Sequence, residues 1–171
     1  FIDPYVMGIL IGDGCFRGRI EFSSVDSEII ESVGKSLPKR LKAKHKGQYD
    51  YRICGDIKGV RNPIIQEIKR LGLWNKLSYE KFIPDLFKFN DFNTRVAILQ
   101  GLMDSDGYGK ESTLEFTSSS CQLSEDVKFL VESLGGTATL SIKETTFTYK
   151  NEKKKGKPCY RLNIKMPPEI S

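Results

Sequence analysis

The hydrophobic pattern of the chain follows a helical period and then a strand-like period, and this order occurs twice. Apolar runs with helical spacing cover residues 5–11 and 96–103. Asp3-Pro4 and Asn93-Thr94 stand before them, where helix N-caps are expected, and Gly14 and Gly107 stand where helices end. We therefore expect helices at about 4–13 and 94–106.

A period of two follows each of these helices and indicates a strand with one buried face. Phe16, Ile20 and Phe22 alternate with polar residues in the first half, and Leu114 and Phe116 do so in the second. The pattern then predicts amphipathic helices at about 26–37 and 122–134, a helix at about 62–71, and alternating strands at about 41–46, 48–54, 137–150 and 158–165. This order predicts an α+β fold with antiparallel sheets.

Short matches in the same order indicate that the chain is an internal duplication. Residues 8–14 match 101–107, residues 21–24 match 115–118, and residues 51–53 match 160–162. The offset between the copies only grows along the chain, as small insertions in the second copy would require. We predict two domains, 1–92 and 93–171. The second is shorter or truncated, because nothing after Lys165 matches the expected helix at 62–71.

Small residues recur four positions apart on one face of each leading helix, which allows two backbones to approach closely. They are Gly8 and Gly12 in the first helix, and Gly101 and Ser105 in the second. If the two helices pack side by side and parallel, Asp13 and Asp106 meet at their C-terminal ends, where the helix dipole disfavours negative charge. A divalent cation such as Mg²⁺ would relieve this repulsion. One Asp-Gly pair alone is usually just a helix end and turn, but two in register favour a metal site.

The runs VMGILIGDG (6–14) and LQGLMDSDG (99–107) resemble the nine-residue signature of the LAGLIDADG homing endonucleases. The resemblance covers residues 4 to about 165. It implies two pseudo-symmetric αββαββα-type repeats in a monomer, with the signature helices packed at the centre and saddle-shaped antiparallel sheets on DNA. In this family the last acidic residue of each signature binds the metals, which implies that role for Asp13 and Asp106. The first copy has Ile11 where the family usually has Asp, whereas Asp104 keeps the pattern.

A basic residue also belongs in such a site, to stabilise the phosphorane charge or to help activate water. The segment 81–84, Lys-Phe-Ile-Pro, resembles the Lys-x-x-Pro segment of intein-encoded members, so Lys81 is the third catalytic candidate. The alternative is a solvated lysine before a loop proline. The second copy shows no counterpart segment, and Lys165 is the candidate basic residue there. Residues 149–161 also resemble intein-encoded members, which suggests an intein origin, but the splicing blocks are absent.

The charge balance favours an anionic partner, since 27 Lys and Arg residues against 22 Asp and Glu residues give a net charge of +5. Basic clusters occupy corresponding regions of the two copies, and residues 145–158 read as a long hairpin with a lysine-rich tip. Paired clusters favour phosphate contacts on both sides of one duplex, and polar strand residues suit base edges. The DNA-binding candidates are Arg17, Arg19, Lys44, Lys46, Gln48, Arg52, Lys143, Lys150, Lys153, Lys154, Lys155, Lys157, Arg161, Asn163 and Lys165.

Other classes of protein fit the sequence poorly. No apolar run approaches the roughly 20 residues that span a bilayer, and there is no signal-peptide pattern, so we expect a cytoplasmic protein without membrane contact. Four dispersed cysteines and a single histidine argue against a zinc site or histidine chemistry and suggest reduced thiols.

The sequence therefore predicts a site-specific double-strand DNA endonuclease that hydrolyses phosphodiesters with Mg²⁺. The resemblance implies a long recognition site and staggered cuts with short 3′ overhangs. Mn²⁺ is a possible substitute, and Ca²⁺ should support binding without cleavage. The expected partner is double-stranded DNA, with no small-molecule substrate. The alternative is a catalytically silent RNA maturase or DNA-binding regulator of the same fold, which the retention of both aspartates disfavours. A basic α+β module without a nucleic-acid role would make the duplication a coincidence.

Overall fold

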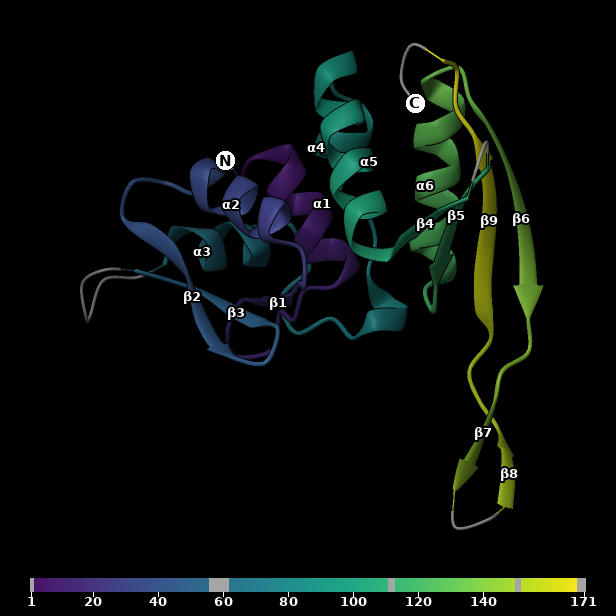
Figure 1. Ribbon diagram of the computed structural model, residues 1–171. Helices are drawn as coiled ribbons and strands as arrows, with labels where there is room; N and C mark the ends of the chain where they lie inside the picture. The colour runs from purple at the N-terminus through teal and green to yellow at the C-terminus, as the bar shows by residue number, and fades with distance from the viewer. Residues whose placement is uncertain (1, 56–61, 111–112, 150–151, 169–171) are drawn as a thin grey trace.

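Two helices in contact form the centre of the molecule, and each has a sheet beyond it (Figure 1). The computed structural model describes residues 2–55, 62–110, 113–149 and 152–168. The central helices are α1 (Pro4–Gly12) and α5 (Phe92–Asp106). The Asp3 carboxylate caps α1 by accepting from the Val6 backbone N–H, as expected. The expected cap of α5 at Asn93 is wrong, because Asp91 accepts from the Thr94 N–H and hydroxyl and starts the helix earlier.

The first half of the chain forms a three-stranded antiparallel sheet with two helices. Its elements are β1 (Glu21–Ser23), α2 (Ser27–Ser36), β2 (Leu41–Gly47), β3 (Asp50–Gly55) and α3 (Pro63–Arg70), with strand order β1-β3-β2. The strand expected from Phe16 onward is shorter than predicted. Phe16 and Ile20 are both buried, but they reach the core from a loop that turns at Gly18, whose φ is +71°.

The second half forms a four-stranded antiparallel sheet covered by one long helix. Its elements are β4 (Gly107–Lys110), β5 (Thr113–Ser118), α6 (Cys121–Ser133), β6 (Thr137–Lys143) and β9 (Cys159–Lys165), with strand order β4-β5-β9-β6. Apart from β4, which the sequence did not predict, this order repeats that of β1, β3 and β2. The predicted α+β fold with antiparallel sheets is confirmed.

The long strand expected at 137–150 is interrupted after Lys143. Beyond the break, β7 (Thr146–Tyr149) pairs with β8 (Glu152–Lys155) as a separate hairpin that extends away from the body (Figure 1). Thr145 closes the base of this hairpin, because its carbonyl accepts from the Gly156 N–H and its hydroxyl donates to the Lys157 carbonyl at 2.6 Å. The hairpin expected at residues 145–158 is therefore present, and a break in β pairing separates it from the four-stranded sheet.

The segment between α3 and α5 contains two short elements that the sequence did not predict. They are a 3₁₀ turn, η1 (Ser78–Glu80), and α4 (Asp85–Lys88), which packs on α5 and α6. Within the described ranges no helix has both the length and the apolar character needed to cross a membrane. All four cysteine thiols are free.

Candidate metal and nucleic-acid site

The backbones of α1 and α5 touch where the sequence has small residues. A Cβ atom added to Gly8 would lie 2.9 Å from Gly101 Cα, closer than real Cβ contacts. One helical turn further on, a Cβ on Gly12 would lie 2.9 Å from Ser105 Cβ. Because Gly8 meets Gly101 and Gly12 meets Ser105, the two helices run in the same direction and their C-terminal ends lie together.

Two carboxylates are brought together at this shared end. A Cβ on Gly12 would be 3.4 Å from Asp106 Oδ2, so the Asp106 carboxylate lies beside the end of α1, next to Asp13. Partial burial, followed by the charge of Asp13, raises the pKa of Asp106 to about 6, against the opposing effect of Lys81. Burial also raises the pKa of Asp13, while Lys81 and the Ser23 backbone N–H lower it.

Replacing Asp106 with asparagine is expected to stabilise the metal-free protein at neutral pH. The folded-state pKa of about 6 lies above the ordinary value of 3.8, so the folded state holds this proton more tightly than the unfolded state. That stabilisation is complete below about pH 4 and is lost as the pH rises through about 6. The advantage of Asp106→Asn should therefore be absent at pH 4 and reach about 1–3 kcal/mol at pH 7.

Urea unfolding in EDTA between pH 4 and 8 measures this difference. Asp91→Asn is the control of opposite sign, because hydrogen bonds from Thr94 lower the pKa of Asp91. Its ionisation therefore favours folding at neutral pH. An advantage of Asp106→Asn that shrinks as the pH rises would contradict the expected carboxylate repulsion.

Lys81 reaches this site from the segment between α3 and α5. Its side chain is buried, with 5% exposure, so the solvated alternative is wrong. The ammonium donates to the carbonyls of Gly12 at 2.9 Å and Gly14 at 2.7 Å, and it lies 5.5 Å from the centre of the Phe16 ring. Burial lowers the pKa of Lys81 to about 8, while the charges of Asp106 and Asp13 raise it. A cation at the C-terminus of α1 also suits the helix dipole.

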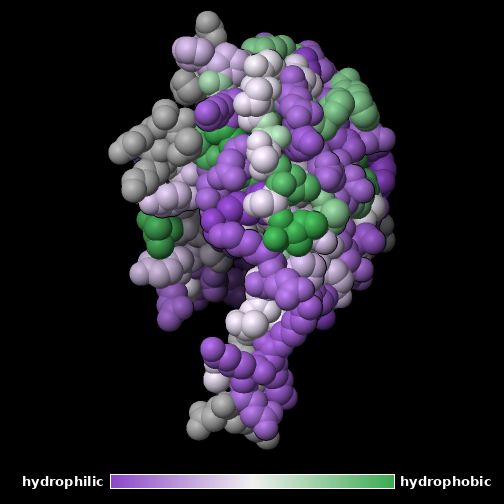
Figure 2. All heavy atoms as spheres, turned by 90° about the vertical axis from the view of Figure 1, so that its right-hand side faces the viewer, coloured by the Kyte–Doolittle hydropathy of each residue, from purple (hydrophilic) through white to green (hydrophobic). Residues whose placement is uncertain are grey.

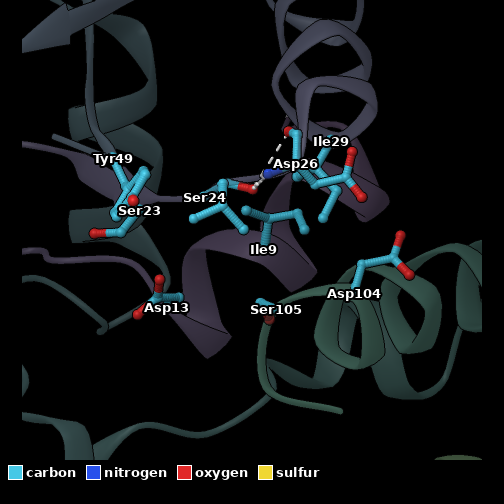
Figure 3. Close-up of a pocket in the computed structure, with 10 residues that line it drawn as sticks. Ile9, Asp13, Ser23, Ser24, Asp26, Ile29, Tyr49, Asp104 and Ser105 are labelled. Carbon is cyan, nitrogen blue, oxygen red and sulfur yellow. Dashed lines mark hydrogen bonds between the residues drawn. The ribbon is translucent and has the colours of Figure 1, made fainter. Parts of the chain in front are cut away.

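An open pocket of about 430 Å³ lies beside Asp13, between α1, α2 and α5 (Figure 3). Asp104 lines it too and accepts a hydrogen bond of 2.9 Å from the Tyr5 hydroxyl, and burial together with this bond raises the pKa of Tyr5. Ile11, at the corresponding position of the first signature, is fully buried. Ile11 therefore stands in the core, whereas Asp104, its counterpart in the second signature, lines an open pocket. The lining residues are Ile9, Asp13, Ser23, Ser24, Val25, Asp26, Ile29, Tyr49, Asp104 and Ser105.

Comparison with solved structures places this arrangement in a known fold. The chain is similar to the homing endonuclease I-DmoI in complex with DNA and Ca, with a TM-score of 0.60 and 14% identity over 98% of this chain and 94% of that chain. A complex of I-DmoI with DNA and Mn gives a TM-score of 0.60 and 15% identity over 95% and 88%. The chain has the LAGLIDADG homing endonuclease fold. Residues 93–165 also match the family model of the LAGLIDADG-like domain.

The curated relatives are much longer proteins. The replicative DNA helicase DnaB of Nostoc sp. is 28% identical over 96% of this chain, and that of Rhodothermus marinus is 30% identical over 79%. The protein RecA of Mycobacterium tuberculosis is 29% identical over 79% of this chain. The chain spans only 16–21% of the length of these relatives.

Each of the two larger sheets of this chain carries an arginine next to a glutamate on its polar face. In the first sheet, Glu21 Oε1 lies 2.9 Å from Arg52 Nε and 2.8 Å from Lys46 Nζ, and Arg19 is nearby at 3.8 Å. In the second, Arg161 Nε lies 2.9 Å from Glu115 Oε1. The two pairs occupy matching sequence positions. The predictions had named the basic partners but missed both glutamates, which the repeated Glu-Phe-Ser/Thr-Ser match had contained.

The other DNA-binding candidates lie mostly on exposed positions of strands, turns and the hairpin. Lys153, Lys154 and Lys155 are exposed on β8, and Figure 2 shows the hairpin as a mainly hydrophilic projection. Lys155 pairs with Glu144 at 2.6 Å, and Lys157 lies over the Tyr79 ring. Lys150 falls outside the described residues. The remaining exposed candidates are Arg17, Lys44, Gln48, Lys143, Asn163 and Lys165.

Proposed function

We propose that this chain is a site-specific endonuclease that cuts double-stranded DNA with the help of a divalent metal held by Asp13 and Asp106. The observation that carries the proposal is the meeting of these two carboxylates, with Lys81 buried beside them, at the end of two helices in backbone contact. The fold supports it, because I-DmoI shares this fold and has been solved with DNA in the presence of Ca, Mn and Mg.

The donor set fits Mg²⁺ or Mn²⁺ better than zinc. In the part of the chain that the structure describes, no group of three or more His, Cys, Asp or Glu side chains gathers to hold a metal ion. Two carboxylates, with the remaining positions left to water and phosphate, are what Mg²⁺ and Mn²⁺ accept, whereas zinc prefers nitrogen and sulfur ligands. Burial and the charge of Asp13 raise the pKa of Asp106, and a bound cation would oppose both effects.

The residues of the chain divide the catalytic work. A bound divalent ion would polarise the scissile phosphate and the attacking water. Asp13 and Asp106, at the C-terminal ends of the two central helices, would hold the ion. Lys81 keeps its ammonium at the carbonyls of Gly12 and Gly14, where it stabilises negative charge that develops on the phosphate. With a pKa of about 8 it is mainly protonated at neutral pH.

We propose that the DNA runs along the polar faces of both sheets as one duplex, bound by a monomer of two repeats, 1–92 and 93–171. Arg52 is hydrogen-bonded to Glu21, Arg161 forms an ion pair with Glu115, and both arginines are suited to base edges. The lysines of β8 supply phosphate contacts further along the duplex.

An intein origin is also part of the proposal. The chain aligns with a small part of two proteins that have different names, DnaB and RecA. A mobile segment inserted into different host proteins would produce this pattern. The resemblance of residues 81–84 to the Lys-x-x-Pro segment of intein-encoded members agrees with it.

Selection of cleaved sites from a randomised double-stranded DNA library tests the function. We expect both strands of one long site to be cut with Mg²⁺ or Mn²⁺, binding without cutting with Ca²⁺, and no cutting in EDTA. Sequence-specific binding with no cleavage under any of these ions would instead indicate the silent DNA-binding alternative. Absence of both binding and cleavage would reject the proposal.

Replacing Lys153, Lys154 and Lys155 with alanine is expected to weaken binding to all DNA sequences alike. Because phosphate contacts release counterions, the slope of log K against log salt concentration should fall by roughly 1–3. Fluorescence anisotropy between 50 and 300 mM salt, on specific and random duplexes, measures it. A matched triple variant, Lys35→Ala, Lys69→Ala and Lys128→Ala, removes the same charge from helices and should keep a slope nearer to that of the wild type. Equal slopes for the two triple variants would mean that the hairpin makes no DNA contact.

A further inference from the structure

We propose that Ser120 and Asp126, both on the second-half helix α6 or at its start, are positioning residues for Lys81. They hold the backbone of residues 81–83 at two points and so set where the Lys81 ammonium lies. The inference rests on the proposed function, since Lys81 matters for catalysis only if the chain cuts DNA. Its structural content can be tested without DNA.

Ser120 holds the first of these two points, the Lys81 carbonyl. Its side chain is fully buried, and its hydroxyl donates to the Lys81 carbonyl at 2.7 Å. The same oxygen accepts from the Leu123 N–H at 3.1 Å as the N-cap of α6. Because the oxygen caps the helix, its one proton is directed at Lys81, and the start of α6 fixes this carbonyl.

Asp126 holds the second point, the Ile83 N–H. Its side chain has 3% exposure, and Oδ2 accepts from the Ile83 N–H at 2.8 Å. Oδ1 accepts from Lys88 Nζ at 2.8 Å and from Gln122 Nε2 at 3.0 Å. A buried carboxylate needs such partners, and two of the three come from the segment that carries Lys81.

These two hydrogen bonds restrict the backbone segment that carries Lys81. A free lysine side chain has many rotamers, and holding it in one position costs conformational entropy. Here the backbone on either side of Phe82 is held by α6, and the ammonium is held at the end of α1 by the Gly12 and Gly14 carbonyls. Helix α6 of the second half thus places the lysine whose ammonium lies at the end of helix α1 of the first half. A loss of either hydrogen bond from α6 should leave Lys81 present but misplaced.

The first test changes Ser120 and is read without DNA. We expect the ¹H–¹⁵N signal of the Lys81 ammonium, identified by its loss in Lys81→Arg, to be sharp in the wild type at fixed low temperature and pH. It should persist in Ser120→Thr, which keeps the hydroxyl, and broaden beyond detection in Ser120→Ala. Since Ser120 is also a helix cap, Asn62→Ala removes another N-cap, that of α3, as a control for lost stability. Asn62→Ala should keep the signal.

The second test separates DNA binding from chemistry. Ser120→Ala should lower the single-turnover cleavage rate about tenfold with Kd unchanged within a factor of two, whereas Ser120→Thr should restore the rate. For Asp126, the double variant Asp126→Asn with Lys88→Met keeps an acceptor for the Ile83 N–H and should cleave at close to the wild-type rate. Asp126→Leu with Lys88→Met removes that acceptor and should be slowed. Circular dichroism checks that each variant is folded.

Three results would overturn the positioning role. One is an unchanged ammonium signal and cleavage rate in Ser120→Ala. Another is an equal loss in Asn62→Ala, because the effect would then follow from stability alone. The third is an equal rate for the two Asp126 double variants. If the wild type cleaves no DNA, the proposed function fails while the ammonium signal still decides whether α6 places Lys81.

Discussion

Asp13→Asn and Asp106→Asn are each expected to abolish cleavage of both DNA strands while leaving DNA binding intact. Asparagine keeps the size of the side chain but is a poor Mg²⁺ ligand, and the attacking water then loses its activation. We expect the single-turnover rate to fall by about 10³-fold or more, the scale seen when a group that stabilises the transition state is lost. Kd should stay the same or improve, because the crowded carboxylate pair is relieved.

A neighbouring aspartate provides the matched control for this pair. Asp104 lies two residues before Asp106 on α5, but its carboxylate is directed to the Tyr5 hydroxyl. Asp104→Asn makes the same chemical change, keeps an oxygen that can accept this bond, and should cleave within a few-fold of the wild type. The shared metal site would be wrong if Asp13→Asn or Asp106→Asn cut both strands at the wild-type rate, or if the wild type cut fully in EDTA.

Gly8→Ala and Gly101→Ala are expected to destabilise the protein strongly although each adds only one methyl group. A Cβ at either position would lie within 2.9 Å of backbone atoms of the facing helix, which cannot move aside as a flexible side chain can. The helices must separate, and overpacking of this kind costs about 1–3 kcal/mol or more. In a chain of this length, thermal unfolding should shift down by roughly 2–4 °C per kcal/mol.

A glycine-to-alanine substitution should instead stabilise the protein where the added methyl group meets no neighbouring atom. Gly34 lies in helix α2, and an added Cβ would meet nothing within 4 Å. Gly34→Ala should therefore raise stability by about 0.5–1 kcal/mol through helix propensity. At the second contact the obstacle is the Ser105 side chain, so Ser105→Gly should recover part of the loss caused by Gly12→Ala. Equal effects at Gly8 and Gly34 would show that the close helix contact is not required.

If Ser120 and Asp126 place Lys81, the two halves of the chain are not independent catalytic units. The lysine lies in the segment between α3 and α5, its ammonium donates to carbonyls at the end of the first central helix, and its backbone is held by helix α6 of the second half. A change in the packing of α6 would then alter chemistry at the carboxylate pair without any contact to DNA.

Much of the fold followed from the sequence because it depends on residues close together in the chain. Helix and strand periods predicted most elements to within a few residues, since each period reflects which face of a local segment is buried. The duplication did more, because it related positions far apart in the sequence. It predicted that Gly8 and Gly101 share one environment, and that Asp13 and Asp106 end equivalent helices. Lys81 was found through its resemblance to a known segment.

Tertiary structure alone decided the features that depend on contacts between distant residues. Asp126 reads as one polar residue on an amphipathic helix, and only the fold brings it to the Ile83 N–H, 43 positions away. Ser120 caps α6, a local role, but its proton is donated to the Lys81 carbonyl 39 positions away. The break after Lys143 depends on the return strand β9, which pairs with β6 only up to that residue. Local patterns report which side of a segment is buried, whereas partners across the fold are selected by how the segments pack.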